Sequence, residues 1–494
     1  MFWDDLTPRD IMCDQGGAGE SSPALLGSGA FSNVTRVRIQ RSQDVQDRSN
    51  GSNSDQQPPC YYALKTLKRS LLPQDSSQVS ASRRTMTMTR RNPNEDAAEH
   101  EDAQHDRCAM FVKAAQELAK EADLLAHLDE DAHPHIIKIC GWTTGGTAAY
   151  DTYRRHDAFF LVLELLQPDT LEDRIQQWNT DDLEQRYHAE PRPPQDDDRH
   201  HHDRTMEKLT ICAQMANALD YIHSKNIVYR DLKPQNVGFA VPRESASKNN
   251  TVHVKLMDFG LARELSSSAE RIRDEPGIGT IRYMAPEVYI PSSTAAPQDD
   301  NDDHDAAAGY GIQADIYSWS IVCYELLTQA LPFANMSPRQ YLQYVCHYGV
   351  RPNSWNNMTG TVIEHPLHQT TLQHDGRPIL PEHYLVLLAN AWRTDPSKRL
   401  SLHQIEFQLD LFLQKEELEH EAKQLQQRHD NDLLFLRSRM MQQQQQQQQL
   451  LCHALQQQQM QQQRHRSFIP PPMVLPSSVL DIPSEAFQFY IPPK

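Results

Sequence analysis

Residues 229–236 place three side chains that can handle a phosphoryl group within one short polar segment. The Asp231 carboxylate can accept or orient the proton of a hydroxyl group, and the Lys233 ammonium can steady a phosphate. The amide oxygen of Asn236 is a hard ligand of the kind that Mg²⁺ prefers. The segment therefore predicts the transfer of a phosphoryl group to a hydroxyl.

A second carboxylate follows a predicted strand further along the chain. The apolar run that begins at Val254 leads into Asp258-Phe259-Gly260, the pattern of a strand that ends in a turn. We expect Asp258 to bind Mg²⁺ that bridges the nucleotide phosphates, and Phe259 to pack beneath it. Together with Asn236, Asp258 completes a predicted magnesium site.

A glycine-rich turn near the N-terminus is suited to holding phosphates. Gly27, Ser28 and Gly29 lie within a predicted strand–turn–strand over 24–39, and glycines let backbone N–H groups approach phosphate oxygens closely. A hairpin turn without a ligand would show the same pattern. The next predicted strand carries Lys65, which is placed to reach the α- and β-phosphates.

Lys65 requires a carboxylate partner, and the predicted helix over 110–128 offers two. Glu121 lies on the helix face suited to Lys65, and Glu117 lies one turn earlier. From the residues alone, both remain candidates.

The elements that must position these side chains change in type along the chain. Apolar runs at 24–39, 60–68 and 159–166 predict strands, whereas apolar residues at helical spacing over 110–128 and 206–224 predict helices. A strand-rich part is thus followed by a mostly helical part, which indicates an α+β fold.

Low-complexity segments separate the patterned ones. Their polar compositions bury too little apolar area to offset chain entropy. We interpret them as surface loop insertions within one domain, since long loops add little closure entropy. The insertions span about residues 41–59, 70–109, 179–204 and 291–309.

The C-terminal region is predicted to be helical and then extended. Residues 414–466 form a Gln-rich helical, low-complexity segment. Leu411, Leu418 and Leu425 fall seven residues apart, but polar partner positions give a coiled coil only weak support. Residues 467–494 contain proline-rich stretches, which indicate a disordered tail or a docking peptide.

Composition narrows the class of protein. The formal net charge of -18 disfavours a nucleic-acid-binding surface, because phosphate backbones repel such a chain. The eight cysteines are scattered without a CxxC pair, as in reduced intracellular proteins. The sequence shows no secretory signal and no apolar run long enough for a membrane span. We expect an intracellular, cytoplasmic protein, with a nuclear location left open.

The motifs resemble those of the eukaryotic protein kinase family. GSGAFSNV, YALK, HPHII, YRDLKPQN, DFG and APE occur in the family's order over about residues 20–413, which leaves 1–19 as an N-terminal segment. The family's spacing favours Glu121 over Glu117. The resemblance also implies that Glu287 pairs with Arg399, and that Asp315 anchors the catalytic loop.

The resemblance implies a two-lobed fold with ATP and Mg²⁺ in the cleft between the lobes. A small antiparallel sheet with one main helix forms the first lobe, and the second is larger and mostly helical. The lysine in DLKPQN and Gly279-Thr280 before RYMAPE resemble serine/threonine kinases, including tyrosine-kinase-like ones, so a protein substrate with a serine or threonine hydroxyl is expected. The implied catalytic residues are Lys65, Glu121, Asp231 and Lys233, and the implied nucleotide contacts are Leu26, Gly27, Ser28, Gly29, Val34, Ala63, Lys65, Glu164 and Leu166.

Three residues depart from the family pattern around the nucleotide. Ser32 replaces the third glycine of the turn, from which we expect slower or tuned turnover, and Tyr229 replaces a histidine. Gly238 falls where the family places a bulky apolar residue under the adenine ring. We expect the missing side chain to leave a wider pocket floor.

The activation segment also departs from the family pattern. Arg230 precedes Asp231, the arrangement in which a phosphorylated residue pairs with the arginine. The expected phosphosite region instead holds Asp274 and Glu275. We hypothesise that this acidic pair partly substitutes for a phosphate; the alternative is that both acids are simply solvated.

Two other classes of function compete with an active serine/threonine kinase. The first is a pseudokinase-like scaffold that acts through its C-terminal tail, which degraded catalytic residues would favour. The second is a tyrosine-specific or small-molecule kinase, which the LKPQN and GTIRYMAPE motifs disfavour.

Overall fold

The chain, seen here as a computed structural model, divides into two compact units, Met1–Glu417 and Leu418–Lys494. The structure describes residues 3–13, 25–39, 60–71, 93–153, 155–187, 194–242, 252–268, 270–289, 309–357, 361–362 and 380–466. The predicted insertion at 41–59, nearly all of that at 291–309 and the tail at 467–494 lie outside the described residues.

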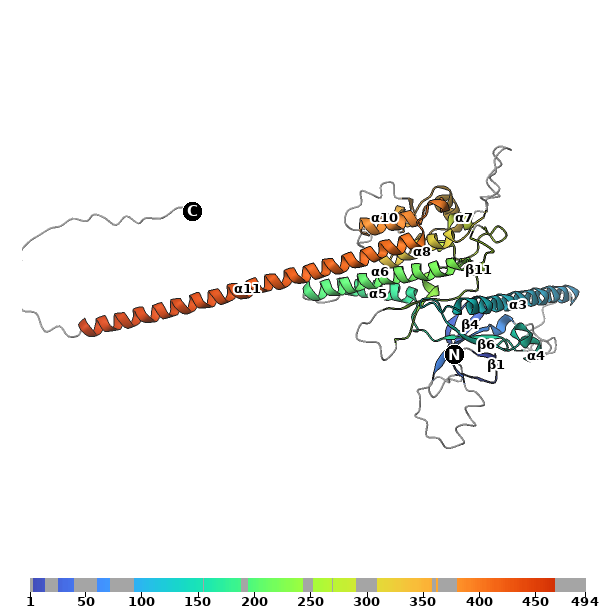
Figure 1. Cartoon of the computed structure of the whole chain (residues 1–494), viewed down its shortest axis with the longest axis horizontal. Helices are drawn as coiled ribbons and strands as arrows, with labels where there is room; N and C mark the ends of the chain where they lie inside the picture. The colour runs from blue at the N-terminus through green and yellow to red at the C-terminus, as the bar shows by residue number, and fades with distance from the viewer. Residues whose placement is uncertain are drawn as a thin grey trace, which may run out of the picture. The chain divides into compact units, whose positions relative to one another are not determined.

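In the described part of the chain, a seven-stranded sheet forms the N-terminal lobe (Figure 1). The strand order is β1-β6-β7-β5-β4-β2, with β3 paired to β4, and every pairing except the parallel β1–β6 pair is antiparallel. The strands are β1 (Trp3–Leu6), β2 (Ile11–Cys13), β3 (Leu25–Ser28), β4 (Ser32–Ile39), β5 (Tyr61–Leu67), β6 (Ile139–Thr143) and β7 (Phe160–Glu164).

The sheet begins earlier than the sequence indicated. Strands β1 and β2 come from the segment 1–19, which the motif order leaves outside the domain, and they form two edges of the sheet. Trp3 and Leu6 are buried, and the Trp3 ring meets the Tyr62 ring edge-on at 5.0 Å. The pattern missed these strands because each has only three or four residues, too few to show a period.

Helix α3 (Pro93–Asp129) packs against β6 of the sheet. Its side chains Leu118, Ala122 and Leu125 are buried at helical spacing, as predicted. The expectation of a loop insertion through residue 109 is wrong for residues 93–109, which belong to this helix. Alanine, glutamate and glutamine are good helix formers, so a helix stabilised by its packed part extends through this polar stretch.

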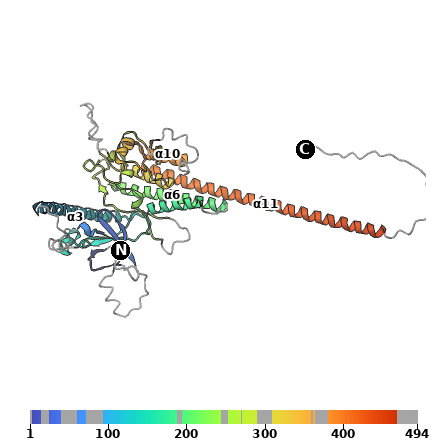
Figure 2. The same ribbon diagram turned by 180° about the vertical axis from the view of Figure 1, so that it is seen from behind.

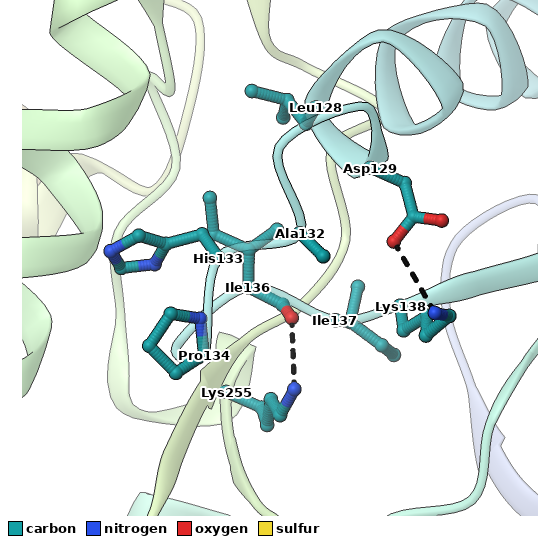
Figure 3. A pocket seen from close by; sticks show the side chains of 9 residues that line it. All are labelled: Leu128, Asp129, Ala132, His133, Pro134, Ile136, Ile137, Lys138 and Lys255. Atoms are coloured by element: carbon teal, nitrogen blue, oxygen red, sulfur yellow. Dashed lines mark hydrogen bonds and ion pairs between the residues drawn. The ribbon is translucent and has the colours of Figure 1, made fainter.

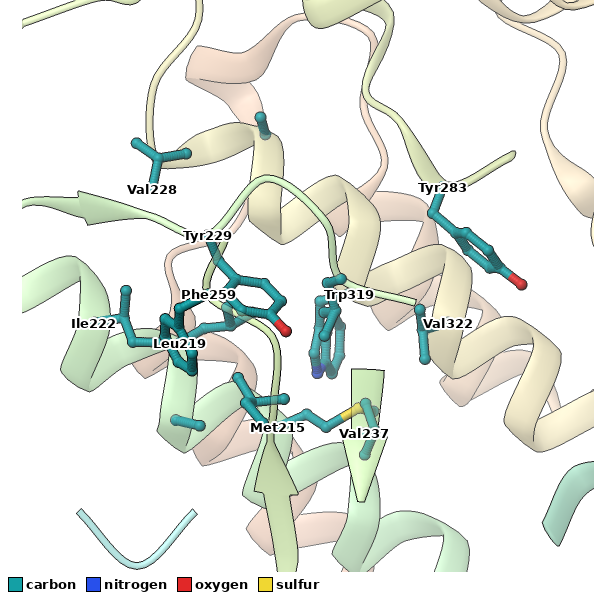
Figure 4. Close-up of a cluster of buried hydrophobic side chains, with 14 of the residues drawn as sticks. Met215, Leu219, Ile222, Val228, Tyr229, Val237, Phe259, Tyr283, Trp319 and Val322 are labelled. Carbon is teal, nitrogen blue, oxygen red and sulfur yellow. The ribbon is translucent and has the colours of Figure 1, made fainter. Parts of the chain in front are cut away.

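The C-terminal lobe is mostly helical, which confirms the predicted α+β, two-lobed fold (Figures 1 and 2). Helices α6 (Pro194–Ser224) and α8 (Gln313–Thr328) lie in contact at its centre. Met215 and Leu219 of α6 join Trp319 of α8 in a buried cluster that includes Tyr229 and Phe259 (Figure 4). This core supports the chain segments that carry the predicted catalytic residues.

The lobes contain further helices. The α-helices are α4 (Ala149–Tyr153), α5 (Leu171–Tyr187), α7 (Pro286–Tyr289), α9 (Pro338–Gln340) and α10 (Glu382–Ala391), and η8 (Tyr341–His347) is a π-helix. The short 3-10 turns are η1 (Arg69–Leu71), η3 (Gly146–Ala148), η4 (Pro234–Asn236), η5 (Ile281–Tyr283), η9 (Pro352–Ser354) and η11 (Pro396–Lys398). Three antiparallel strand pairs complete the lobe: β8 (Ile227–Val228) with β11 (Arg263–Glu264), β9 (Val237–Phe239) with β10 (Val254–Leu256), and β12 (Trp355–Asn356) with β13 (Thr361–Val362).

The predicted loop insertion at 179–204 is helical at both ends, because α5 and α6 extend into it. Arg204 of α6 pairs with Asp182 and, at 3.7 Å, with Asp181 of α5. The Lys208 ammonium lies over the Trp178 ring, 5.7 Å from its centroid. The expectation of a loop is wrong for the described parts of this segment, since charge pairing between the two helices takes the place of apolar burial.

Helix α11 (Leu402–Arg466) begins in the first unit, where Leu402, Ile405 and Leu409 are buried. In the second unit, Leu418 and Leu425 are 65% and 64% exposed. A coiled coil through these leucines stays a prediction.

Candidate active site

The ammonium group of Lys65 lies between two carboxylates from distant parts of the chain. Its Nζ is 2.7 Å from each carboxylate oxygen of Glu121 on α3, and 2.8 Å from Oδ1 of Asp258. The competing Glu117 instead lies 4.0 Å from Lys113 on the same helix. The structure therefore brings three of the predicted site residues together.

The charges in this triad leave one negative charge unbalanced. Burial would lower the pKa of Lys65, but the charges of Glu121 and Asp258 outweigh it and raise this pKa above its ordinary value. The Lys65 charge in turn lowers the pKa of Asp258. The Glu121 side chain is 3% exposed and that of Asp258 is 50% exposed, so the surplus charge is accessible at Asp258.

Asp231 is held by neighbours in its own segment and by Thr280, the residue that directly precedes η5. Lys233 Nζ lies 2.6 Å from Oδ2 of Asp231, and the Thr280 hydroxyl donates to Oδ1 at 3.0 Å. The Asn236 amide nitrogen donates to the backbone oxygen of Asp231 at 2.9 Å and to its Oδ2 at 3.1 Å. Because the nitrogen of Asn236 faces Asp231, the amide oxygen points elsewhere, as a metal ligand requires.

Asp315 of α8 fixes the backbone of the same loop. Its buried carboxylate accepts hydrogen bonds from the backbone N–H groups of Tyr229 and Arg230, both at 2.8 Å, and lies 2.8 Å from Nε2 of His223. Arg230 has a φ of 70°, a left-handed conformation that persists only where surrounding contacts hold it. These contacts match the anchoring role implied for Asp315.

The model of the protein kinase domain family matches residues 97–408, a range that includes Glu121, Asp231 and Asp258. The chain belongs to the protein kinase family. Lys65 and the glycine-rich turn precede the matched range. The structure nevertheless places them in the sheet of the kinase domain and brings Lys65 onto Glu121.

Two curated proteins are similar to parts of the chain. The "Light-sensor Protein kinase" of Ceratodon purpureus is 30% identical over 196 residues, which cover 40% of this chain and 13% of that protein. The "Putative ribosomal protein S6 kinase alpha-2" of Caenorhabditis elegans is 24% identical over 306 residues, or 59% of this chain and 30% of that protein. The similarity therefore spans less than a third of the length of either relative.

The two acidic residues of the expected phosphosite region each pair with an arginine. Glu275 pairs with Arg230, and Asp274 pairs with Arg263 at 2.8 Å. The Tyr310 hydroxyl donates to the backbone oxygen of Glu275 at 2.9 Å and accepts from Arg230 at 3.3 Å. The hydrogen bond from Arg230 lowers the pKa of Glu275 below its ordinary range. Sequence reasoning missed Tyr310, because no local motif links it to Arg230.

The implied pair of Glu287 and Arg399 is present in the structure. Arg399 donates from Nη1 and Nη2 to the two carboxylate oxygens of Glu287, at 2.6 and 2.8 Å. The Arg399 side chain is fully buried and also donates to backbone oxygens of Gln313 and Arg393. This bidentate pair fastens α7, at the end of the activation segment, to the chain before α11.

The residues predicted to contact the nucleotide lie on β3, β4, β5 and at the end of β7. Gly27 lies opposite Val34 in the register, and Val34 lies opposite Lys65. Gly29 N–H donates to the backbone oxygen of Ser32 at 2.9 Å, so the residue that replaces the third glycine closes the turn. The remaining predicted contacts are Leu26 and Ser28 on β3, Ala63 on β5, Glu164 at the end of β7, and Leu166, which bridges to Ala240.

The expectation of a wider floor at Gly238 is wrong. A Cβ atom at Gly238 would lie 2.8 Å from Cδ1 of Leu166 and 2.8 Å from the sulfur of Met257. Side chains from two other segments therefore fill the space. The sequence could not show this, because both residues are remote from Gly238 along the chain.

A small cavity of about 130 Å³ lies apart from these residues (Figure 3). It is bounded by the C-terminal end of α3, the loop that follows it and Lys255 of β10, and no predicted site residue lines it. Lys255 Nζ donates to the backbone oxygen of Ile136 at 3.2 Å and pairs with Glu164 at 2.7 Å.

The described part of the chain shows neither a candidate metal cluster nor a candidate membrane span. No cluster of three or more His, Cys, Asp or Glu side chains in the described ranges could hold a metal ion. None of the described helices combines the length and the apolar character needed to cross a membrane.

Proposed function

We propose that this kinase domain is active and transfers the γ-phosphoryl group of ATP to serine or threonine hydroxyls of protein substrates. The observation that carries the proposal is the contact of Lys65 with both Glu121 and Asp258. A lysine held in this way can bind phosphates without rearrangement, since its position and charge are already fixed.

The donor set of the site fits a magnesium ion. Asp258 offers a half-exposed carboxylate, and Asn236 offers an amide oxygen turned away from Asp231. Both are hard oxygen ligands, and the triad of Lys65, Glu121 and Asp258 carries a surplus negative charge. Bound there, Mg²⁺ would offset the charge of the phosphate oxygens.

The contact between Lys233 and Asp231 supports a role for both side chains at the acceptor hydroxyl. Asp231 would accept the hydroxyl proton, and the Lys233 ammonium, 2.6 Å from it, would stabilise negative charge on the transferred group. The Thr280 hydroxyl contacts Asp231 at 3.0 Å and Lys233 at 3.3 Å. An aliphatic hydroxyl already fits between these two groups, which favours serine or threonine as the acceptor.

The remaining assignments rest on the family. The backbone of Glu164 and Leu166 would bind adenine, and the glycine-rich turn would cover the phosphates. We propose a kinase domain at 20–413, joined by β1 and β2, with a Gln-rich segment at 414–466 and a proline-containing tail at 467–494, which is either a disordered end or a docking peptide for a protein partner. An intracellular signalling role, cytoplasmic with a nuclear location left open, is part of the same proposal. The acidic composition argues against nucleic-acid binding, and the scattered cysteines without a CxxC pair fit a reducing compartment.

The proposal predicts unequal effects of two neighbouring lysines. Lys65→Met removes the ammonium that holds phosphate, so label transfer from γ-labelled ATP to a generic protein substrate should fall about 100-fold or more. Lys68→Met, three residues further on and directly after β5, is the matched control and should keep wild-type transfer. The measurement is initial transfer rate at saturating Mg²⁺.

Two results would contradict the proposal. A wild-type rate no higher than that of Lys65→Met would favour a pseudokinase-like scaffold. Equal losses in both variants would show that the effect is structural and not specific to Lys65.

A further inference from the structure

Helix α11 carries a stripe of apolar side chains along one face within the second unit. The helix runs without a break over Leu402–Arg466 (Figure 1). The stripe consists of Leu418, Leu425, Leu433, Leu436, Met440 and Leu451. At about 100° of rotation for each residue, these positions fall within an arc of about 80°. Each of these side chains is more than half exposed, so the stripe is open to a partner.

The stripe follows a period of eleven residues. Leu425 lies eleven residues before Leu436, and Met440 lies eleven residues before Leu451. This repeat, at about 3.67 residues per turn, nearly matches the straight α-helix of about 3.6, so the stripe stays on one face. From Leu418 to Leu451 it extends over about 50 Å. Another helix with the same period can cover a surface of this length and width, and a second copy of the chain supplies one.

Charged residues flank the stripe near its middle. With the same rotation for each residue, Asp430 and Arg437 lie on one side of the stripe, and Asp432 and Arg439 lie on the other. On each side, the acid precedes the base by seven residues. These four charges distinguish the two orientations in which a second α11 could pack.

A parallel pair in register brings like charges together. Opposite sides of the two stripes then meet, so Asp430 faces Asp432 of the second copy. By the same geometry, Arg437 faces Arg439 of the second copy. Contacts between like charges disfavour this orientation.

An antiparallel pair brings unlike charges together. The same sides of the two stripes then meet, so Asp430 faces Arg437 of the second copy. On the other side, Asp432 faces Arg439 of the second copy, and the twofold symmetry repeats both pairs. Charge complementarity therefore selects the antiparallel orientation.

The apolar positions fit the same antiparallel register. When Leu433 faces Leu436 of the second copy, the twofold symmetry also brings Leu418 opposite Leu451. In this register, the facing charges are offset by only about 3 Å along the helix axis, which their side chains can span. The apolar and the charged contacts thus agree on one arrangement.

We propose that a second copy of this chain covers the stripe, and that two α11 helices pair antiparallel over residues 418–451. Burial of the leucines and the methionine supplies the attraction, because apolar area leaves water on both helices. The exposed ion pairs fix the orientation and add little to the affinity. The pairing joins two kinase domains in one assembly and does not depend on their activity.

The first test is the molar mass of the full-length protein, measured by analytical ultracentrifugation over a range of concentrations. Wild type should form a dimer. Leu436→Asp places a charge in the stripe and should weaken dimerisation about tenfold or more. Leu434→Asp is the matched control, because this neighbouring leucine is also exposed but lies on the opposite side of the helix, and it should dimerise like wild type.

Three results of this test would overturn the proposal. The first is a wild-type protein that is monomeric at every concentration. The second is a Leu436→Asp variant that dimerises as tightly as wild type. The third is an equal loss in the Leu434→Asp variant, which would show that the stripe is not the contact surface.

The second test is the orientation of the two helices, determined by cross-linking. Leu418→Cys and Leu451→Cys are made in full-length Cys452→Ser protein, which lacks the exposed thiol of α11, and they carry tags of different size. The two variants are mixed, allowed to exchange and treated with a short bis-maleimide. An antiparallel pair brings the two new thiols together, whereas a parallel pair separates them by about 50 Å.

We expect a cross-linked product that contains one chain of each variant. Cys452→Ser protein without a new cysteine is the control and should not give this product. Cross-linking of each variant only with itself would overturn the antiparallel pairing.

Discussion

Glu325 is a carboxyl group buried at 6% exposure, and its partner is the Tyr283 hydroxyl, which donates to it at 2.8 Å. Burial raises the pKa of Glu325 to about 7, although the hydrogen bond from Tyr283 opposes the shift. The folded protein therefore keeps this proton at pH values where the unfolded chain has lost it. Ionisation of Glu325 therefore destabilises the folded state.

The shift gives a stability prediction with a definite sign. Because the folded pKa lies above the ordinary value of 4.5, the free energy of unfolding should decrease as pH rises from about 4.5 to 7. Glu325→Gln keeps an acceptor for Tyr283 but cannot ionise. Between pH 5 and 8 this variant should lose about 2 kcal/mol less stability than wild type, at ~1.4 kcal/mol for each unit of pKa shift.

The measurement is chemical unfolding at several pH values. Glu264→Gln is the control, because that carboxyl is exposed and should leave the wild-type pH dependence in place. Parallel curves for wild type and Glu325→Gln would contradict a raised pKa at Glu325.

Some residues of the site could be predicted from the sequence, and others could not. Lys65, Glu121 and Asp258 could be chosen from motif order, because each stands in a short segment whose spacing is diagnostic. The surroundings of Gly238 could not, since Leu166 and Met257 arrive from other segments and only the fold shows them filling its space. Thr280 served in the sequence only as a marker of substrate type, and the structure places it on Asp231.

In the activation segment, Asp274 and Glu275 form ion pairs with arginines. The Arg230 side chain is 7% exposed and pairs with Glu275, while Asp274 binds Arg263 nearer the surface. Tyr310 adds a contact to each partner of the Arg230–Glu275 pair. The hypothesis that an acid substitutes for a phosphate therefore gains a specific residue, Glu275, and a specific partner.

Removal of that charge should lower activity without phosphorylation. Glu275→Gln leaves the buried Arg230 guanidinium without a carboxylate, so the segment before Thr280 loses its anchor and kcat should fall about tenfold. The neighbouring variant Asp274→Asn should lose less than threefold in kcat, because its partner Arg263 is nearer the solvent. The rates are measured on phosphatase-treated protein. If phosphatase treatment removes essentially all activity of the wild-type protein, the hypothesis that Glu275 takes the place of a phosphate is refuted.

Elements were predictable where a hydrophobic period runs through them. The part of α3 around Leu118 and Leu125 and the core of α6 follow a helical repeat, so both were expected. Strands β1 and β2 are too short to carry a period. The helical ends of 179–204 depend on charge pairs such as Arg204 with Asp182, which a search for apolar burial does not detect.

At the scale of the whole molecule, the proposed site lies within Met1–Glu417. All of its residues lie in that unit, whereas the second unit contributes the exposed leucines of α11 and the Gln-rich segment. The family match over 97–408 also falls within the first unit. An active kinase would therefore act through the first unit, whereas a pseudokinase-like scaffold would act through the second.

The most direct test of the central claim is identification of the phosphorylated amino acid after transfer from γ-labelled ATP. Wild-type protein is compared with Asp231→Asn, which keeps the size of the side chain but cannot accept the hydroxyl proton. We predict labelled phosphoserine or phosphothreonine with wild type, and a rate about 100-fold lower with Asp231→Asn. Label that appears only as phosphotyrosine, or equal transfer by the two proteins, would contradict the account.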